Sequence, residues 1–284
     1  MAELKNTVIS DVGAITLPKG TTAQRPTFPP DGALRYNTDL GYVECFHKNF
    51  WFDLSTGRGL PKGGRDRYIE LDASIPESTN GTTAAGWTNI GYQSGRNFDF
   101  YGSPTYNSDG YKSYWRFDTS DHATCVNTCA DLDYNSVECV FRRFTDSGNI
   151  LYNKESTWEV QTSGNNFQWA WLTTDRSWYW SSTGTIGQNW YHSVVTYDGN
   201  RVRAYVNGRL RQTDDAYNNG TLSANTSSYP KLNGRSDPRT SATSYGNHDI
   251  AYFAVYDRPL DDNEVHHNYQ AHAERFDLPF IPYN

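Results

Sequence analysis

WYHSVVTYDGNRVRAYVNGRL, residues Trp190–Leu210, decides the fold class of this chain. Short apolar runs alternate with turn residues, which predicts three β-strands joined by turns at Asp198–Asn200 and Asn207–Gly208. An Asn-Gly pair between two such runs is a strong hairpin signal, because both central residues must accept positive φ angles. Every second residue of Val202–Val206 is apolar, so one face of that strand is expected to be buried. The stretch therefore predicts an antiparallel, half-solvated sheet and not a nucleotide-handling α/β enzyme.

Further strand candidates follow one another at short, regular spacing, with turn residues between them. They lie at Arg67–Leu71, Tyr114–Phe117, Ser136–Phe144, Asn149–Tyr152, Trp158–Gln161, Phe167–Leu172, Trp178–Ser181, Tyr229–Asn233 and Ile250–Tyr256. One helix is predicted at Asp261–Ala273, because Asp261 can cap its start and Glu264 can complete a capping box. The pattern predicts an all-β fold: an antiparallel β-sandwich or jelly roll that ends in one short C-terminal helix.

The composition excludes several classes of protein. Aromatic residues make up 15% of the 284 residues, which is too many for a disordered chain. The net charge is −7 and no run of Lys or Arg stands out, so we expect no nucleic-acid partner. No apolar stretch approaches the ~20 residues of a membrane-spanning helix, so no membrane insertion is expected.

The N-terminus and the cysteines indicate the compartment. MAELKNTVIS lacks the apolar core of a secretion signal, so synthesis in the cytoplasm is expected. Four cysteines occur, and their spacing is not that of a zinc site. We therefore expect reduced thiols at Cys45, Cys125, Cys129 and Cys139.

A glycine-rich segment divides the chain. Residues 58–66 contain RGLPKGG, which suits neither a strand ladder nor a helix and predicts a linker. Residues 1–57 are predicted to form an extended arm, in which prolines exclude a helix, and a small β-module. The strands of this module are expected at Ala33–Tyr36, Tyr42–Phe46 and Phe50–Leu54. Residues 67–276 are assigned to the jelly-roll domain and residues 277–284 to an extended tail.

Two blocks resemble the laminin G-like members of the concanavalin A-like lectin/glucanase superfamily. WYHSVVTYDGN with VRAYVNG, residues 190–200 and 202–208, is similar to a pair of adjacent strands in that family. DIAYFAVYDRPL with DNEV, residues 249–260 and 262–265, is similar to the closing strand and the helix that follows it. A weaker match joins YWRFD (114–118) to NSVECVF (135–141). The resemblance implies a laminin G-like jelly roll, but lectins, adhesion modules and glucanases all share this fold.

The N-terminal segment resembles a module common in tail fibres and other appendage proteins of tailed bacteriophages. The matching residues are GAITLPKGTTAQRP at 13–26, GALRYNT at 32–38 and FWFDL at 50–54. The resemblance implies a virion protein whose residues 1–57 pack against identical arms in a homotrimer or against other virion proteins.

The paired acids of the sugar-cleaving members are incomplete here. Those enzymes carry E-x-D-x-E or E-x-D-x-x-E on one strand, so that two carboxylates flank the glycosidic bond. YIELDASIPE, residues 68–77, begins with Glu70 and Asp72 but has Ser and Ile where the third acid is required. Glu77 follows a proline and has the opposite pleat parity. We therefore expect exposed acids on an early strand, no catalytic residues and no enzyme, with a glycan hydrolase as the least favoured function.

An aromatic cluster is the candidate carbohydrate site. Sugars stack on flat aromatic rings and hydrogen-bond to nearby polar groups, so an exposed cluster suits a host-surface glycan. The candidate residues are Trp169, Trp171, Asp175, Arg176, Trp178, Tyr179 and Trp180. Alternation places Phe167, Trp169 and Trp171 on one face, and the other interpretation is that these rings fill the core or a trimer interface.

Calcium is a further candidate ligand. It prefers about six to eight oxygen ligands, and loops rich in Asp and Asn offer them. Weak candidates are Asp198, Asn200, Asp214, Asp215, Asn218, Asn219 and Asn247. These residue types also populate turns for backbone reasons, and no fixed-spacing calcium motif is present.

The remaining candidate groups have simpler explanations. His192 is expected to be a packed structural residue and not a base. His266 and His267 lie on the predicted helix without a nucleophile placed by any motif. The pair Arg142 and Arg143 is too small for a polyanion site.

These observations predict a bacteriophage virion structural protein, a fibre or decoration protein exposed on the particle surface. Its lectin-like domain is expected to adhere weakly to host glycan and to gain strength from many copies on one particle. The alternative is a capsid-decoration or neck/tail protein whose jelly roll makes only protein contacts.

Overall fold

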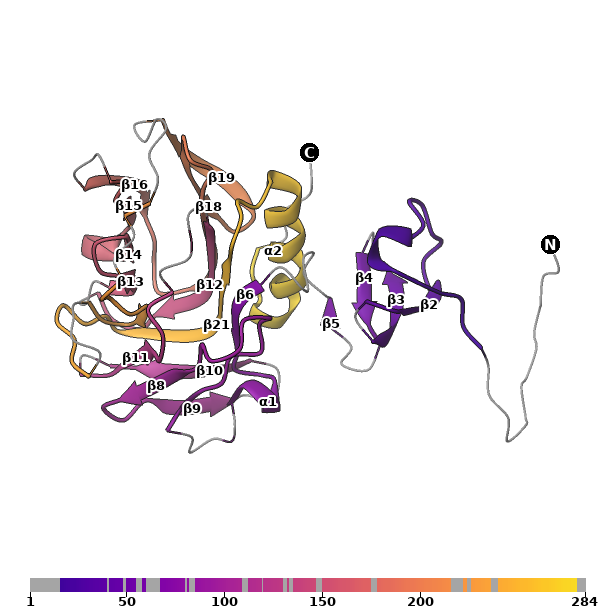
Figure 1. Cartoon of the computed structure of the whole chain (residues 1–284), viewed down its shortest axis with the longest axis horizontal. Coiled ribbons are helices and arrows are strands. Elements are labelled where there is room, and N and C mark those ends of the chain that lie inside the picture. The colour runs from indigo at the N-terminus through magenta and orange to yellow at the C-terminus, as the bar shows by residue number, and fades with distance from the viewer. Residues whose placement is uncertain are drawn as a thin grey trace. The chain divides into compact units, whose positions relative to one another are not determined.

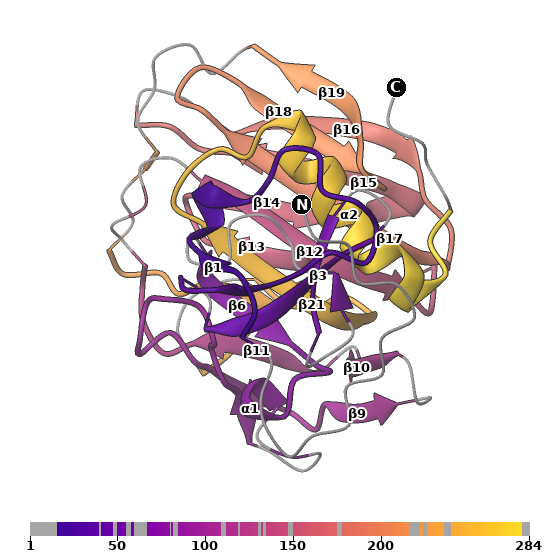
Figure 2. The same ribbon diagram turned by 90° about the vertical axis from the view of Figure 1, so that its right-hand side faces the viewer.

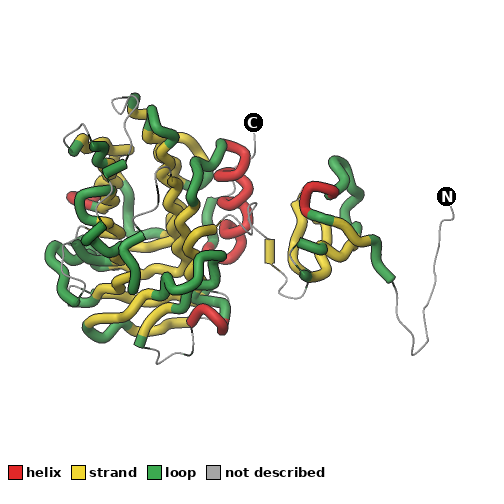
Figure 3. Tube along the Cα trace, in the orientation of Figure 1, coloured by secondary structure: helices red, strands yellow, loops and turns green. Residues whose placement is uncertain are grey.

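The computed structural model describes residues 16–39, 41–47, 50–54, 58–59, 67–79, 81, 85–108, 112–118, 120–129, 132, 135–146, 150–174, 178–215, 222–223, 226–235 and 240–279. The chain divides into two compact units, Met1–Leu60 and Pro61–Asn284 (Figure 1). Strands dominate the regular structure of both units (Figure 3).

The first unit is a five-stranded sheet in the order β1-β2-β3-β4-β5. Its strands are β1 (Lys19–Gly20), β2 (Leu34–Asn37), β3 (Tyr42–His47), β4 (Phe50–Asp53) and β5 (Arg58–Gly59). The three predicted strands are present, each within a residue of its expected bounds. β5 was not predicted, because it uses the first two residues of the expected linker to pair with β4. The rest of that linker, residues 60–66, lies outside the described residues.

The sheet of the first unit buries charge on one face and leaves apolar side chains on the other. Arg35 and Glu44 are register partners on β2 and β3, and both are buried. Arg25, from the arm that follows β1, donates to the Glu44 carboxylate with an Nη2–Oε2 distance of 2.6 Å. Leu34 and Tyr36 alternate with Arg35 along β2, so they occupy the opposite face, where they are 40% and 39% exposed.

The second unit is a sandwich of two antiparallel eight-stranded sheets. One sheet has the order β16-β15-β14-β13-β20-β11-β8-β7. The other, called the helix-covered sheet, has the order β19-β18-β17-β12-β21-β10-β9, with β6 also paired to β21. The strands are β6 (Arg67–Asp72), β7 (Gly86–Trp87), β8 (Phe98–Tyr101), β9 (Thr105–Ser108), β10 (Ser113–Phe117), β11 (His122–Cys125), β12 (Asn135–Arg143), β13 (Ile150–Lys154), β14 (Trp158–Gln161), β15 (Asn166–Trp171), β16 (Tyr179–Thr185), β17 (Trp190–Tyr197), β18 (Val202–Val206), β19 (Arg209–Asp214), β20 (Lys231–Leu232) and β21 (His248–Tyr256).

Two apolar clusters hold this unit together. The main core lies between the sheets and contains the inward residues of both, including Cys125, Cys129 and Cys139. None of the four cysteines forms a disulfide bond, and the Sγ atoms of Cys125 and Cys129 are 4.0 Å apart. The second cluster lies between the helix-covered sheet and helix α2 (Asp262–Phe276), which crosses that sheet (Figure 2).

The structure confirms the predicted all-β sandwich with a C-terminal helix. The predicted capping box is present: Asp261 accepts from the Glu264 backbone N–H, and the Glu264 side chain accepts from that of Asp261. In the second unit four short strands were missed, namely β7, β8, β9 and β11, as was the one-turn helix α1 (Pro76–Thr79), and in the first unit β1 was missed as well as β5. None of the helices in the described residues has the length and apolar character needed to cross a membrane.

Candidate functional site

A row of charged and aromatic side chains crosses the helix-covered sheet. Arg116 of β10 is the register partner of Asp249 of β21, Asp249 is that of Arg142 of β12, and Arg142 is that of Trp190 of β17. The buried Asp249 carboxylate accepts from Arg116 Nε at 2.7 Å and from Arg142 Nη2 at 2.5 Å. The Arg142 guanidinium also lies 5.0 Å from the centre of the Trp190 ring, which is a cation–π distance.

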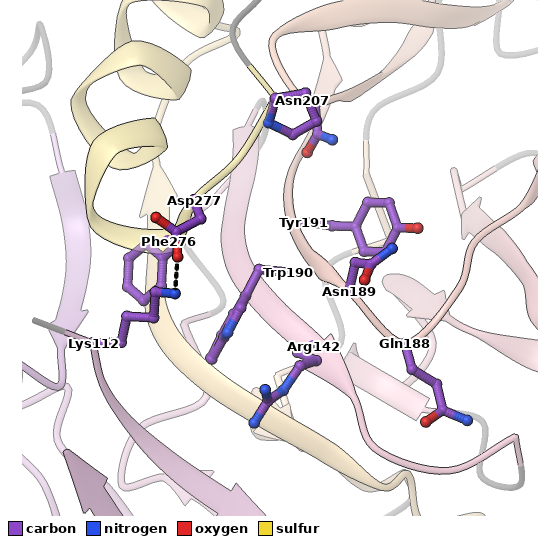
Figure 4. Close-up of a pocket in the computed structure, with 10 residues that line it drawn as sticks. Lys112, Arg142, Gln188, Asn189, Trp190, Tyr191, Asn207, Phe276 and Asp277 are labelled. Atoms are coloured by element: carbon purple, nitrogen blue, oxygen red, sulfur yellow. Dashed lines mark hydrogen bonds and ion pairs between the residues drawn. The ribbon is translucent and has the colours of Figure 1, made fainter. Parts of the chain in front are cut away.

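This row ends in a pocket of about 410 Å³. The pocket opens where β12 ends and β17 begins, beside the C-terminal end of α2. It is lined by Lys112, Arg142, Gln188, Asn189, Trp190, Tyr191, Asn207, Phe276, Asp277 and Pro279. Figure 4 shows Asn207 at one end and Arg142 at the other, with Trp190 and Tyr191 between them.

The Asn207–Gly208 turn aims one amide at the pocket. Both residues have positive φ angles, 52° and 70°, as an Asn-Gly hairpin turn requires. The His192 backbone N–H donates to Asn207 Oδ1 at 3.0 Å, and the Asn207 N–H donates to the His192 carbonyl at 2.7 Å. These two bonds fix the orientation of an amide that is 7% exposed. Among the described residues, Asn207 Nδ2 has no hydrogen-bond partner.

The pocket is therefore rich in hydrogen-bond donors. In the described part of the chain, Arg142 Nη1 has no partner, because only Nε and Nη2 bond to Asp249 and Tyr114. The Tyr191 hydroxyl accepts from the Gly187 N–H at 2.9 Å, which leaves its own proton to donate. Lys112 is ion-paired with Asp277 across the end of α2, as the dashed line in Figure 4 marks.

A buried polar network anchors α2 beside this pocket. Glu138 of β12 lies 2.8 Å from His192 Nε2 and accepts from the Tyr256 hydroxyl at 2.6 Å. From α2, Asn268 donates to the same carboxylate at 2.9 Å, and His272 lies 3.5 Å from it. Burial alone would raise the pKa of Glu138, but hydrogen bonds with His192 and His272 outweigh it and hold the pKa well below its usual range. The network fixes the helix whose last residues wall the pocket.

The predicted aromatic site divides between the core and the surface. Trp169 and Trp171 point into the main core and are fully buried, so neither ring is accessible to a sugar. This corrects their assignment: alternation correctly placed them on one face, but that face is turned toward the other sheet. Trp180 is the register partner of Ala170, lies on the outer face and is 45% exposed. Trp178 stacks on it, with ring centroids 6.5 Å apart.

The structure does not test the remaining residues of that predicted carbohydrate site. Asp175, Arg176 and the side chain of Tyr179 lie outside the described residues. A carbohydrate contact at Trp178 and Trp180 stays a prediction.

The calcium candidates are engaged in turns and ion pairs. Asp198 accepts from the backbone N–H groups of Asn200 and Arg201 and pairs with Arg203. Asp214 accepts from the Ser181 hydroxyl, and Asp215 pairs with Arg201. Asn247 accepts a backbone hydrogen bond from Phe144, and Asn218 and Asn219 lie outside the described residues. Within the described ranges, no group of three or more His, Cys, Asp or Glu side chains could hold a metal ion, so the calcium prediction gains no support.

The two acids of the incomplete hydrolase motif are buried, and the prediction that they are exposed is wrong. Glu70 is ion-paired with Arg67, and burial nevertheless raises its pKa. Asp72 accepts from two nitrogens of Arg275 of α2, both at 3.0 Å. Burial would raise the pKa of Asp72, but Arg275 lowers it strongly. Both carboxylates are thus engaged in ion pairs, Glu70 within β6 and Asp72 with α2.

Sequence reasoning missed the residues of the pocket. Arg142 and Arg143 were considered as one basic pair, but alternation puts them on opposite faces. Arg143 is buried and donates to the Ile186 carbonyl, whereas Arg142 reaches the pocket. The available signal was the position of Arg116, Trp190 and Asp249 in the three motif blocks, which could be connected only once the strand register was known.

Comparisons with known proteins agree with the fold. Residues 133–266 match a family model described as the concanavalin A-like lectin/glucanases superfamily. No curated protein sequence matches the chain.

Solved structures similar to this chain include binding domains of botulinum neurotoxins. The serotype D/C binding domain has a TM-score of 0.53 and 14% identity, over 72% of this chain and 52% of that one. The type G receptor-binding domain has a TM-score of 0.51 and 14% identity, over 72% and 51%. This chain thus spans about half the length of those structures. The likeness concerns the fold alone, and it agrees with the family-model match over residues 133–266.

Proposed function

We propose that this chain is a bacteriophage virion structural protein that displays a glycan-binding domain on the particle surface. The domain binds host-surface glycan in the pocket between Asn207 and Arg142. The observation that carries the proposal is the pair of unpartnered donors, Asn207 Nδ2 and Arg142 Nη1, in a cavity lined by Trp190 and Tyr191. Fixed polar groups orient a hydroxyl-rich ligand, and aromatic rings supply its apolar contacts.

The similar solved structures are compatible with this function. They are receptor-binding domains, and the cell entry of botulinum neurotoxin type C depends on interaction with two ganglioside molecules. Gangliosides carry glycans, so proteins of related fold take part in glycan-dependent attachment.

The first unit is the part that we assign to attachment and trimer formation. Its resemblance to phage appendage modules supports a place in the virion. The apolar face of its sheet, with Leu34 and Tyr36 exposed, supports a protein contact. A homotrimer made in the host cytoplasm and joined to other virion proteins would present three pockets, and many copies would strengthen weak binding.

Asn207→Asp tests the pocket with little disturbance to the turn. Asp keeps the oxygen that accepts from the His192 N–H and tolerates a positive φ angle, but it loses the Nδ2 donor. The purified protein and this variant would be applied to a glycan array and to whole host cells. We expect the wild type to bind, and the variant to lose about tenfold in affinity with an unchanged thermal unfolding midpoint.

The double variant Trp178→Ala/Trp180→Ala is the matched comparison, because it removes the other exposed aromatic surface. If the pocket is the glycan site, this variant binds glycan like the wild type, and the predicted carbohydrate contact at Trp178 and Trp180 is wrong. If it abolishes binding while Asn207→Asp has no effect, the pocket is not the glycan site.

The competing function is purely structural, with the jelly roll making only protein contacts. The exposed side chains of Trp180 and Leu210 favour it, because apolar groups on one unit suit a protein neighbour. Electron microscopy of particles that carry the protein separates the two functions. A pocket open to solvent agrees with glycan binding, and a pocket covered by a neighbouring virion protein contradicts it.

A further inference from the structure

We infer that the pocket selects an anionic glycan, one that carries a carboxylate or sulfate group, and that Arg142 contacts this group. The inference rests on the proposed glycan function and adds the chemical class of the ligand. It comes from the charge balance of the row that ends in the pocket and from the hydrogen-bonding state of one guanidinium.

The floor of the pocket carries an excess of positive charge. Asp249 is the single carboxylate shared by Arg116 and Arg142, so this group of three, in which only Asp249 is fully buried, holds one uncompensated cation. Lys112 and Asp277 add one charge of each sign. The local excess of positive charge stands against a net charge of −7 for the whole chain. Such a local field favours an anion over a neutral sugar.

Arg142 is held ready for that anion. Two of its nitrogens are engaged by the fully buried Asp249, and the ring of Trp190 packs against its guanidinium. The side chain is therefore fixed before the ligand arrives, which reduces the entropy lost on binding. The remaining nitrogen, Nη1, has no partner in the described part of the chain. Because Arg142 is 29% exposed, Nη1 can donate a charge-assisted hydrogen bond to a ligand oxygen.

The opposite end of the pocket suits the uncharged part of the ligand. Asn207 Nδ2 is a neutral donor, and Tyr191 can donate through its hydroxyl. Neutral donors of this kind bind hydroxyl and carbonyl oxygens without regard to charge. The two ends of the pocket thus have different roles. Asn207 binds any sugar, and Arg142 distinguishes an acidic sugar from a neutral one.

The test is binding of the full chain to matched pairs of oligosaccharides. Each uronate oligomer is paired with its carboxyl-reduced form, and each sulfated oligomer with its desulfated form. We expect the acidic member of at least one pair to bind about tenfold more tightly. Whether the carboxylate or the sulfate pair responds identifies the group. Arg142→Gln should remove that preference, because it should weaken binding of the acidic member about tenfold more than binding of the neutral member.

Two control variants separate direct contact from general charge. Arg201→Gln changes the net charge by the same amount, but Arg201 forms an ion pair outside the pocket. This variant should therefore leave the preference for the acidic member unchanged. Arg116→Gln removes the other partner of Asp249 and should reduce the preference less than Arg142→Gln does. Equal losses in Arg116→Gln and Arg142→Gln would overturn the direct contact.

The outcomes also distinguish this inference from the function beneath it. If neutral and acidic members bind equally and Asn207→Asp weakens both, the pocket binds glycan and the anionic preference is wrong. If neither member of any pair binds, the proposed glycan function itself is wrong.

Discussion

At the scale of single residues, Gly208 joins the hairpin to the helix. A Cβ atom at this position would lie 2.7 Å from the Tyr269 ring of α2. The backbone φ angle of +70° is also one that residues with a side chain rarely adopt. Gly208→Ala should therefore lose about 2–4 kcal/mol of unfolding free energy, from the backbone strain and the overpacking together. Urea denaturation measures this loss.

Gly95→Ala is the control for that substitution. Gly95 has nearly the same φ angle, +71°, but nothing lies within 4 Å of a Cβ atom placed there. The control should cost only about 1 kcal/mol, which is the backbone contribution. Equal losses in the two variants would show that the contact with Tyr269 contributes nothing.

Two tryptophans on neighbouring strands should differ sharply in their contribution to stability. Trp169→Ala removes a fully buried ring and should cost about 3–5 kcal/mol. Trp180→Ala removes a ring that is 45% exposed and should cost no more than about 0.5 kcal/mol. Urea denaturation of both variants checks the assignment, and a large loss for Trp180→Ala would place that ring in a contact not described above.

The run FQWAW, residues 167–171, shows which part of the burial pattern the sequence alone can predict. The period of two in FQWAW correctly groups Phe167 with Trp169 and Trp171, because alternation is a property of the strand alone. Which face is buried depends on the sheet that packs against it, and residues far along the chain supply that sheet. Both interpretations were therefore open until the partner strands were known.

At the scale of elements, the docking of α2 should be sensitive to acid. Burial lowers the pKa of His272 to about 4, so the folded protein keeps it neutral while the unfolded chain binds a proton below about pH 6.5. At this residue the unfolded state thus binds the extra proton between pH 6.5 and pH 4, so the contribution of His272 to stability falls as the pH falls through this window. Burial lowers the pKa of His122 to about 4 and that of His248 to about 3, which adds to the effect in the same direction.

His272→Phe measures the contribution of one of these groups. Phe keeps a ring against Tyr252, whose centroid lies 4.5 Å away, but it cannot bind a proton. The loss of unfolding free energy between pH 7 and pH 4.5 should be smaller in the variant by about 2–3 kcal/mol, as measured by urea denaturation at both pH values. An unchanged pH dependence would mean that His272 does not gain a proton on unfolding.

Elements with a strong local signal were predicted well, and those without one were missed. The helix has a capping box, and the long strands β12, β17 and β21 have extended apolar runs. β7 and β9 are short strands, GW and TYNS, that pair at the edges of their sheets and have no apolar alternation of their own. The pocket was missed for a related reason: the row that ends in it follows strand register, which no local pattern encodes.

At the scale of the whole molecule, the two units are stabilised in different ways. The second unit has a large apolar core between two sheets. The first unit instead buries the ion pairs of Glu44 with Arg25 and Arg35. Among its described residues, four large apolar side chains are exposed, at Phe28, Leu34, Tyr36 and Leu54. A sheet that hides charge and exposes apolar groups is expected to complete its core by contact with another protein surface.

This inverted sheet leads to a prediction about assembly. If copies of the first unit supply that surface to one another, light scattering should give three times the 32.3 kDa chain mass. Leu34→Glu/Tyr36→Glu places two like charges on the exposed face and should yield the monomer, because burying unpaired carboxylates costs several kcal/mol each. Leu210→Glu, on the exposed edge strand β19 of the second unit, should leave the trimer intact. A wild-type monomer, or a trimer that survives the double substitution, would contradict self-association through this face.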